Sequence, residues 1–448
     1  GELAVPADAL YGAQTQRAVD NFHIGGQPMP VAFIRTLLQV KAAAARANVA
    51  LGALPPETGR AITEAIAQLL TQSDAERMSH FPVEVFQTGS GTSTNMNANE
   101  VIATLASRAL GAPVSANDHV NASQSSNDVI PTTLHASTAI ALAQLLLPAL
   151  DHLSAVTREK AKAVHHHVKT GRTHLMDAMP VRLSQVLDGW AQQVDDAAAH
   201  LRLMQPSLQR LAQGGTAVGT GVNTHPGFAA RFATELSQAT GLAFTPAPDF
   251  FAVMGAQDTV VAVSGQLKAT AVALMKIAND LRWMNSGPLA GLAEIELEAL
   301  QPGSSIMPGK VNPVIPEATA MVAAQVIGND SAVTVAGQSG NFELNVMLPV
   351  IARNVLESVQ LLANTSRLLA DKAIATFRVN EASLADALAR NPILVTALNP
   401  LIGYLKAAEI AKIAYKEGRP ILDVAEEHTA LGREKLAALL DPVKPPGP

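Results

Sequence analysis

Five stretches in which Ala and Leu recur at helical spacing restrict this chain more than any other feature of its sequence. They occupy residues 131–168, 183–211, 252–284, 316–336 and 344–375. Ala and Leu favour helices, whereas the cores of sheets rely on aromatic and β-branched residues. Aromatic residues make up only 4% of this sequence. Since an α-helix of about 35 residues extends about 50 Å, the pattern predicts an elongated bundle of five antiparallel helices.

Helices this rich in Ala bury small-residue faces against close neighbours. Apolar faces left uncovered by that packing predict association with further copies of the chain. Pro148 is expected to kink the first helix, because it removes one backbone donor and crowds the preceding turn. A monomeric α-solenoid is the alternative, although the sequence contains no repeat of about 30–45 residues.

Shorter patterns flank the five stretches. Helices are predicted at 30–51, 57–72, 381–390 and 404–417, a short strand at 82–87, and an extended end at 442–448. The sequence therefore predicts three domains. These are a mixed, mainly helical N-terminal domain (1–126), a central bundle of long helices (127–382) and a small helical C-terminal domain (383–448).

Composition excludes several classes of function. The 32 Lys and Arg residues face 38 Asp and Glu residues, giving a net charge of −6, so no broad attraction to nucleic acid or anionic membrane is expected. The absence of Cys excludes disulfides, thiolate metal sites and cysteine nucleophiles. No signal-peptide pattern and no apolar window of about 18–20 residues is present. A cytoplasmic protein without nucleic-acid or membrane partners is the expectation.

Four segments between the helical patterns are rich in hydroxyls, amides and glycines but poor in carboxylates. They are 88–97, 117–128, 170–174 and 303–312. Ser, Thr and Asn most often cap helices and form turns. Helix N-termini, however, also bind carboxylates and phosphates through unpaired N–H groups. Four such segments in one chain, one with Lys310 and another ending in His174, favour a binding site for a small anion.

The 303–312 segment differs from a phosphate-binding P-loop. Five residues separate Gly303 and Gly309, and Val311 stands where Ser or Thr would bind magnesium. A loop with glycines at both ends, two serines and Lys310 is better interpreted as a lid that closes over a small anion.

Metal and cofactor sites are not expected. Consecutive side chains on a helix point about 100° apart, so His165, His166 and His167 would not converge on one ion. The polar segments contain no Gly-x-Ser-x-Gly elbow, and no dinucleotide-binding fingerprint follows a strand.

Taken together and in this order, the segments resemble the fumarase/aspartase superfamily, specifically class II (iron-independent) fumarases. The 303–312 stretch, GSSIMPGKVN, is similar to the superfamily signature, and recognisable stretches run from Val5 to Asn399. The resemblance implies an all-α, three-domain fold whose central five-helix bundle forms a twenty-helix core in a homotetramer. It also implies active sites assembled from three subunits.

Several positions favour fumarase over aspartate ammonia-lyase, which is the alternative function. Aspartases usually carry Gln in the place of His174. The fumarase-like stretches are 173–175, 214–221, 223–226, 340–345 and 396–400. The 312–317 stretch resembles the aspartase continuation instead. Many class II fumarases also have a second dicarboxylate site, but Ala112 and Ser115 replace its Arg and His here, so that site is expected to be weakened or absent.

The resemblance implies that the protein interconverts (S)-malate and fumarate by reversible anti addition and elimination of water. The difficult step removes a C3 proton and leaves an aci-carboxylate with two negative charges, which preorganised donors stabilise best where water is excluded. Lys310 and Asn312 are expected to bind this carboxylate, with Ser305 as a donor from the loop.

Ser304 is the expected general base, acting as an alkoxide that loop N–H groups and Lys310 must stabilise. His174, paired with Glu317 as in the family, is expected to handle the proton of the departing hydroxyl or to orient water. The residues expected to hold the other carboxylate and the C2 hydroxyl are Ser90, Gly91, Thr92, Ser125, Ser126, Asn127 and Thr173. A catalytically inactive structural relative is a further alternative, which the joint presence of the catalytic residues argues against.

Overall fold

The computed structural model describes residues 3–441, and the chain divides into two compact units. Unit 1 consists of Gly1–Ala149, Ala197–Val272 and Val322–Asn364, and unit 2 of Leu150–Asp196, Ala273–Met321 and Thr365–Pro448. The predicted all-α architecture is confirmed, since the strands that the structure describes form only two-stranded pairs.

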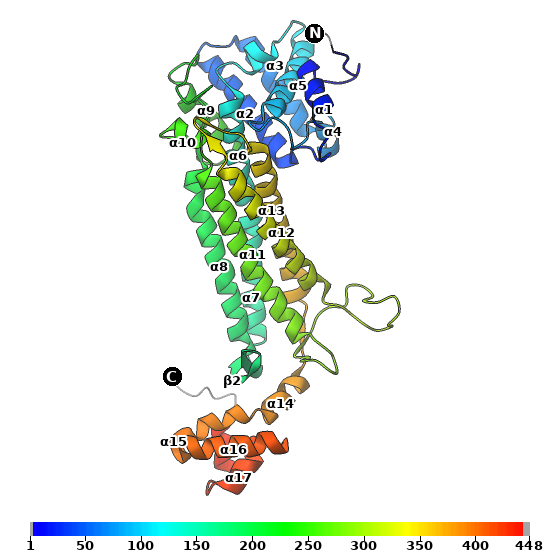
Figure 1. Cartoon of the computed structure of the whole chain (residues 1–448), viewed down its shortest axis with the longest axis vertical. Coiled ribbons are helices and arrows are strands. Elements are labelled where there is room, and N and C mark those ends of the chain that lie inside the picture. The colour runs from blue at the N-terminus through cyan, green and yellow to red at the C-terminus, as the bar shows by residue number, and fades with distance from the viewer. Residues whose placement is uncertain (1–2, 442–448) are drawn as a thin grey trace. The chain divides into compact units, whose positions relative to one another are not determined.

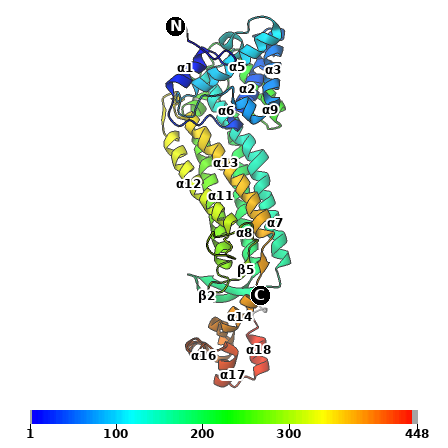
Figure 2. The ribbon, with the colours of Figure 1, turned by 90° about the vertical axis from the view of Figure 1, so that its right-hand side faces the viewer.

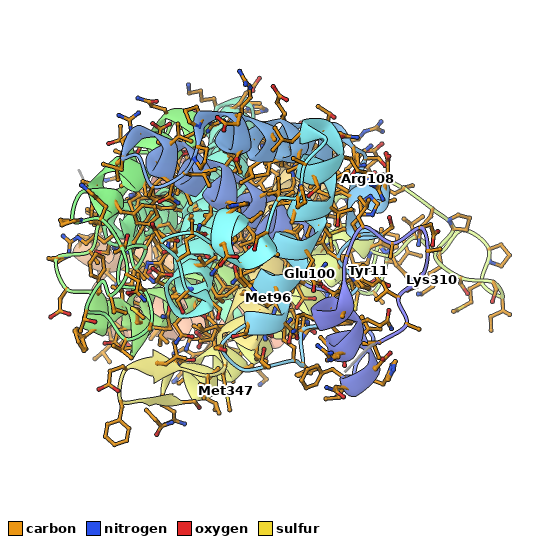
Figure 3. The ribbon with its side chains drawn as sticks, turned by 90° about the horizontal axis from the view of Figure 1, so that it is seen from above. Tyr11, Met96, Glu100, Arg108, Lys310 and Met347 are labelled. Atoms are coloured by element: carbon orange, nitrogen blue, oxygen red, sulfur yellow. The ribbon has the colours of Figure 1, made fainter. Side chains whose placement is uncertain are left out.

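Besides its segments of the long helices, the described part of unit 1 contains seven α-helices of at most 20 residues (Figure 1). They are α1 (Ala13–Asn21), α2 (Val31–Ala50), α3 (Pro56–Thr71), α4 (Asp74–Met78), α5 (Thr92–Leu110), α9 (Phe228–Thr240) and α10 (Phe250–Met254). α2 is buried along most of its length and packs on α3 and α9. Glu100 of α5 ties α1 in place, because its carboxylate accepts the N–H groups of Gly12 at 2.9 Å and Thr15 at 3.0 Å (Figure 3). The helices predicted at 30–51 and 57–72 are thus confirmed.

The strand predicted at 82–87 is wrong. Only an isolated bridge between Pro28 and Glu84 forms there. The backbone N–H of Val85 donates to Gln27, and the Glu84 carboxylate accepts the N–H groups of the 24–26 loop. Since Pro82 has no N–H to donate, this segment forms no regular strand and instead holds the 24–26 loop through Glu84.

Long helices lie side by side in both views (Figures 1 and 2). They are α6 (Ser126–Ala141) continued by η2 (Leu142–Leu146) and α7 (Leu147–Ala163), α8 (Leu183–Leu208), α11 (Asp258–Met284), α12 (Val314–Gly337), and α13 (Leu348–Leu369) continued by η3 (Ala370–Ile374). The five predicted long helices are therefore present, with their ends shifted by up to several residues. Each of them contributes residues to both units.

The irregularity expected near Pro148 takes the form of a π-helix. Residues Leu142–Leu146 make this wider turn just before the proline, and the N–H of Leu147 donates to the carbonyl of Leu142. A π-turn changes the backbone pairing locally, which accommodates a residue that cannot donate an N–H of its own.

Polar contacts, of which the one around Asp330 is largely buried, help to fix the register of neighbouring long helices. In unit 1, Asp330 of α12 accepts hydrogen bonds from Ser264 at 2.8 Å and Lys268 at 2.6 Å, both on α11. In unit 2, Arg158 of α7 donates to Asp195 of α8 at 2.5 Å. Sliding one helix past its neighbour would leave these groups unpaired, which costs more than loss of apolar contact alone.

Two helical stretches have the length and apolar composition of a membrane span. They are Ser126–Ala163 and Asp258–Met284, and 50% and 44% of their most apolar windows are buried within the structure. Core helices of proteins that cross no membrane meet the same criterion, so this property is weak evidence for a span.

The strand pairs are short. β1 (Val168–Thr173) and β2 (Met176–Arg182) form an antiparallel hairpin. The remaining pairs are β3 (Arg210–Leu211) with β4 (Thr245–Pro246), β5 (Ile295–Glu296) with β8 (Arg378–Val379), and β6 (Gly340–Asn341) with β7 (Leu344–Asn345).

The C-terminal helices have a hydrophobic cluster of their own. They are α14 (Glu381–Arg390), η4 (Pro392–Leu398), α15 (Asn399–Ile402), α16 (Tyr404–Glu417), α17 (Ile421–His428) and α18 (Arg433–Leu439). Leu398, Ile410 and Val424 are fully buried in this cluster. The helices predicted at 381–390 and 404–417 are confirmed, and the extended end predicted at 442–448 lies outside the described residues.

Candidate active site

The residues expected at the active site fall into two groups, one in each unit. The group in unit 1 consists of Ser90, Gly91, Thr92, Ser125, Ser126 and Asn127. The group in unit 2 consists of Thr173, His174, Ser304, Ser305, Lys310, Asn312 and Glu317. Hydrogen bonds join several members of the unit 1 group, whereas the unit 2 group is divided between the 303–312 loop and the β1–β2 hairpin.

In unit 1, two helix N-termini present a row of hydroxyls. Thr92 is the first residue of α5, and Ser126 is the first residue of α6. Thr92 Oγ1 lies 2.8 Å from Ser90 Oγ and 2.9 Å from Ser126 Oγ. Both helix ends also carry the positive end of a helix dipole. The structure thus joins two segments that the sequence analysis assigned to carboxylate binding.

Glycines allow the 88–91 loop to pack closely. Gly91 caps α5 with a left-handed φ of 73°, and a Cβ added there would lie 2.8 Å from the Ile130 side chain. Gly89 accepts the N–H of Leu348 at 3.0 Å, and its own Cβ would lie 1.7 Å from the carbonyl oxygen of Val346. No other residue fits at Gly89 without moving the backbone.

Asp128 fastens the start of α6 to a distant loop. Its carboxylate accepts the N–H of Ser125 at 2.9 Å, which completes a capping box. It also accepts the N–H groups of Gly214 at 3.0 Å and Thr216 at 2.8 Å. Burial raises the pKa of Asp128 to about 6, against the lowering effect of these N–H groups and of a nearby lysine. Asn127, the preceding residue, donates to the carbonyl of Ala217 in the same loop at 2.9 Å.

The nearby lysine is Lys41, fully buried on α2. Its Nζ donates to Asn121 Oδ1 and Gln124 Oε1, each at 3.0 Å. Burial lowers the pKa of Lys41 to about 7, against the raising effect of the Asp128 charge. This polar core holds the 121–124 turn that leads into Ser125 and Ser126.

Lys41 and Asp128 were missed by the sequence analysis, although signals for both exist. Ser125 and Asp128 have the spacing of a capping box. Lys41 is the one charged residue among the apolar and Ala-rich positions 37–45. A lone cation in such a run is either at a helix surface or paired inside the core.

In unit 2, the 303–312 loop closes on itself. Gly303 N donates to the carbonyl of Lys310 at 2.9 Å, and Asn312 Nδ2 donates to the carbonyl of Gly303 at 2.9 Å. Lys310 Nζ donates to Asn312 Oδ1 at 2.6 Å. The two residues expected to bind one carboxylate are therefore adjacent. Ile306, between them and Ser304, is 82% exposed, so the loop projects from its unit.

The Ser304 hydroxyl accepts two backbone hydrogen bonds. Ile306 N lies 3.2 Å and Met307 N 3.1 Å from Ser304 Oγ. Turns of this type are common for serine. Two N–H groups directed at one oxygen also stabilise negative charge on it, as in an oxyanion hole.

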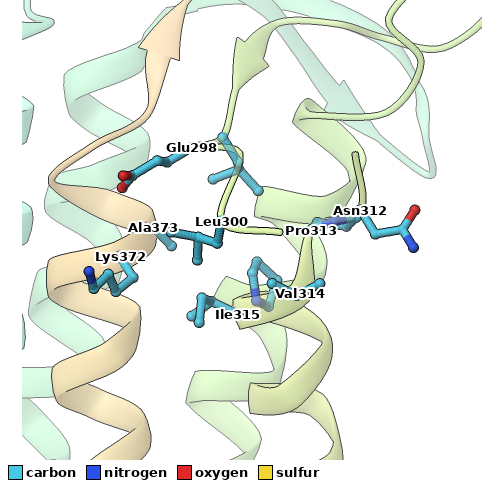
Figure 4. A pocket seen from close by; sticks show the side chains of 10 residues that line it. Glu298, Leu300, Asn312, Pro313, Val314, Ile315, Lys372 and Ala373 are labelled. Atoms are coloured by element: carbon cyan, nitrogen blue, oxygen red, sulfur yellow. The ribbon is translucent and has the colours of Figure 1, made fainter. Parts of the chain in front are cut away.

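A small hollow lies at the base of this loop (Figure 4). Its lining is mainly apolar and includes Leu300, Val314 and Ile315. The Asn312 amide points away from it (Figure 4). Since the expected carboxylate ligand faces elsewhere, this hollow does not hold the substrate.

The other part of the unit 2 group lies at the tip of the β1–β2 hairpin. His174 and Leu175 form its two-residue turn, with φ values of 54° and 60°. Such turns usually contain Asn or Gly, because both positions require positive φ. His174 is exposed. Strained, exposed residues of this kind occur preferentially at functional sites.

A buried ion cluster anchors this hairpin. Glu294, with a side chain only 3% exposed, lies 2.7 Å from Arg172 and 3.3 Å from Lys169. Burial lowers the pKa of Lys169, against the raising effect of Glu294. Removing either cation would leave a buried carboxylate short of partners, which is costly.

Some expected contacts do not form within one chain. Among the described residues, no hydrogen bond or ion pair connects His174 with Glu317.

Ser115, in the expected place of the accessory site, caps the π-helix η1 (Ala116–Val120) and donates to the Asp118 carboxylate at 2.9 Å. That acidic neighbour is unfavourable for binding a second dicarboxylate.

The helical placement of the His165–167 run is wrong. α7 ends at Ala163, and the run lies in the turn and loop that follow. The end comes early because β1 begins at Val168, which pairs with Arg182 in the hairpin. Helical spacing therefore does not keep these three side chains apart.

Comparison with known proteins gives a consistent result. A family model described as lyase matches residues 1–328, and one described as fumarase C C-terminus matches residues 394–444. A Pseudomonas aeruginosa protein named fumarate hydratase class II 2 is 71% identical over 444 residues, covering 99% of this chain and 96% of its own.

Two further relatives span nearly the whole chain. A Xylella fastidiosa protein named fumarate hydratase class II is 58% identical over 443 residues, covering 99% of this chain and 93% of its own. The crystal structure of a class II fumarase from Schistosoma mansoni matches with a TM-score of 0.94 at 37% identity, covering 99% of this chain and 97% of its own.

Proposed function

This chain belongs to the class II fumarate hydratase family of lyases, and we propose how its residues carry out the reaction of that family. The reaction is the reversible addition of water to fumarate, which gives malate. Aspartate ammonia-lyase, the alternative, is not favoured by these relatives. The observation that carries the proposed mechanism is the pair of N–H groups directed at Ser304 Oγ.

Ser304 is the base in the direction from malate to fumarate. Its alkoxide takes the proton from C3 of malate, and the electron pair of the broken C–H bond passes into the adjacent carboxylate. A serine hydroxyl is a weak acid, so the alkoxide requires stabilisation. The N–H groups of Ile306 and Met307 and the charge of Lys310 provide it.

Lys310 and Asn312 bind the carboxylate that becomes doubly negative. An ammonium group and an amide N–H stabilise this charge more strongly once water is excluded. In the described chain Lys310 Nζ donates a hydrogen bond to Asn312 Oδ1. The substrate carboxylate then binds next to both side chains. Ser305 supplies a further donor from the exposed loop.

His174 transfers the second proton. As an imidazolium it protonates the departing C2 hydroxyl, which leaves as water, and the C2–C3 double bond forms as the aci-carboxylate collapses. In the hydration direction the neutral ring takes a proton from the attacking water. Glu317 of another subunit orients the ring and balances its charge.

The other carboxylate is bound by the hydroxyls at the N-termini of α5 and α6. Ser90, Thr92 and Ser126 provide neutral donors, and both helix dipoles favour an anion. Gly91 lets the backbone approach closely, and Ser125 and Asn127 hold the start of α6 in place. Thr173, beside His174, adds a donor from the hairpin.

The complete site is shared among copies in a homotetramer. α12 supports this proposal, because its exposed residues include Met321, Ile327 and Val335 and no charged side chain. Ala324 and Gly328 on the same helix are exposed, so a second helix can approach closely. The other exposed side chains of α12 are the uncharged Gln325, Ser331 and Thr334. A largely apolar, uncharged helix face is normally covered, and the counterpart helix of another copy is the partner it fits.

A substrate assay tests the proposed function directly. Purified protein is mixed with malate or with aspartate, and the absorbance of the fumarate double bond is followed in the ultraviolet. Absorbance is expected to rise with malate alone. A rise with aspartate alone would replace the function by ammonia elimination, and no change with either substrate would support an inactive relative.

A further inference from the structure

Two histidines and a glutamate gather in unit 2, and the proposed reaction uses none of them. His166 and His167 follow the end of α7, and Glu381 is the first residue of α14. One ligand atom from each residue lies within 4.8 Å of the other two. We propose that this trio binds a divalent transition-metal ion, and that Zn²⁺ is the ion it fits.

The three side chains already face one another. The imidazole ring centroids of His166 and His167 lie 3.9 Å apart, with 42° between the ring planes. His167 Nε2 lies 3.9 Å from Glu381 Oε1. In tetrahedral zinc sites with bonds of about 2.0–2.2 Å, ligand atoms lie about 3.3 Å apart. Small rotations of these side chains reach that separation.

The ring nitrogens are available for coordination. In the described part of the chain, no hydrogen bond engages the rings of His166 or His167, whereas His165 Nδ1 lies 3.0 Å from Ser184 Oγ. Zinc binds imidazole nitrogens directly, so neither ring has to give up a hydrogen bond of its own before it binds the ion.

The donor set selects the class of ion. Two imidazole nitrogens and one carboxylate oxygen suit zinc, nickel or copper, whereas magnesium and calcium prefer sites built from oxygen alone. Glu381 is largely exposed, with 76% of its side chain accessible. Water therefore completes the coordination.

A bound ion would connect two separate segments of unit 2. Glu381 begins α14, whose N-terminus is otherwise capped by the Asn380 side chain. His166 and His167 are more than 200 positions earlier in the sequence. The ion would thus hold the first turn of α14 to the end of α7. Slower amide hydrogen exchange at 381–384 is expected when zinc is bound.

The test uses the full-length, untagged protein in its native assembly. Zinc binding is measured by competition with a fluorescent chelator. One ion is expected per chain, with binding lost in the double variant His166→Ala/His167→Ala. Glu381→Gln is expected to weaken it by about tenfold or more, because even outer-shell changes at metal sites cost about 10–100-fold. His165→Ala is the matched control and keeps wild-type affinity.

Location is tested separately by anomalous diffraction from a zinc-soaked crystal. A peak within bonding distance of His166 and His167 supports the site. Wild-type protein that binds no stoichiometric zinc, or a double variant that binds zinc as the wild type does, overturns the proposal. Circular dichroism of each variant verifies that lost binding does not come from lost fold.

Discussion

Thr92 Oγ1 and Ser126 Oγ lie 2.9 Å apart although 34 residues separate them in the sequence. Each hydroxyl stands at the first residue of a helix, so the contact brings two positive helix ends together. The contact joins two polar segments that we propose bind one carboxylate, and this proposal can be tested by removing a single oxygen.

Thr92→Val keeps the shape of the side chain and removes its hydroxyl. The carboxylate loses one donor, and Ser90 and Ser126 lose their common partner. We expect kcat/KM for malate to fall about tenfold, which corresponds to about 1.4 kcal/mol. Steady-state kinetics measure the change, and Thr71→Val, at an exposed position on α3, is the control. Unchanged kcat/KM would exclude Thr92 from substrate binding.

Ser304→Ala removes the proposed base. We expect turnover to fall about 100-fold or more, the usual contribution of a positioned base, while the assembly stays intact in size-exclusion chromatography. Ser305→Ala removes only a binding donor and is expected to cost about tenfold. Turnover close to wild type in Ser304→Ala would assign the base to another group.

His174→Asn separates chemistry from backbone conformation. Asn adopts positive φ more readily than most residues, so the hairpin turn at φ 54° is expected to persist. We expect kcat to fall about 100-fold because the proton donor is lost. His200→Asn, at an exposed position on α8, controls for a general effect of losing a histidine. An active His174→Asn variant would leave His174 with a role in the turn alone.

Lys41→Met tests the buried polar core through pH. The folded chain holds the pKa of Lys41 near 7, below its ordinary value, so between pH 7 and about 10 the unfolded chain binds a proton that the folded chain does not. Stability from this group therefore rises with pH over that interval, by at most about 1.4 kcal/mol per unit.

Lys41→Met is expected to lose this rise of the unfolding free energy with pH. Urea unfolding at fixed protein concentration is compared at pH 7 and pH 9, and the difference in unfolding free energy between wild type and variant should shift in favour of the wild type. Lys162→Met, at an exposed position on α7, should keep the wild-type dependence. If the unfolding free energy of Lys41→Met had the same pH dependence as that of the wild type, Lys41 would be hydrated in solution and not buried.

Val335→Asp places a charge on the exposed face of α12. We expect this charge to dissociate the proposed tetramer, because an unpaired carboxylate in an apolar interface is strongly unfavourable. Light scattering gives the mass, and activity is expected to disappear with the assembly. Leu405→Asp, on α16 and 84% exposed, should leave the mass unchanged. Fully active single chains would refute a shared site.

Local patterns predicted the helices well. The spacing of Ala and Leu is a local signal, and α6 and α12 begin at Ser126 and Val314, close to the predicted starts at 131 and 316. The first long helix was predicted to reach residue 168 but ends at Ala163. Its end depends on pairing between Val168 and Arg182, and such long-range pairing leaves no local pattern. The domain boundaries at 126 and 382 stay predictions.

For the candidate site, too, local patterns and long-range contacts carry different information. Ser304, Lys310 and His174 were predicted as site residues because they lie in polar segments that resemble fumarase motifs, and their roles stay predictions. Lys41 and Asp128 were missed because their importance comes from full burial beside partners far along the chain. Composition alone does not predict which lysine in an apolar stretch is buried.

Leu175 illustrates a choice that the isolated fold does not explain. It occupies a left-handed conformation at φ 60° and exposes 68% of its surface. Asparagine or glycine would relax the backbone there, and a polar side chain would suit contact with solvent better. A leucine in that place gains only when something apolar covers it. We therefore expect another copy of the chain to cover Leu175 in the proposed assembly, which would offset the strain that this residue imposes on the lone polypeptide.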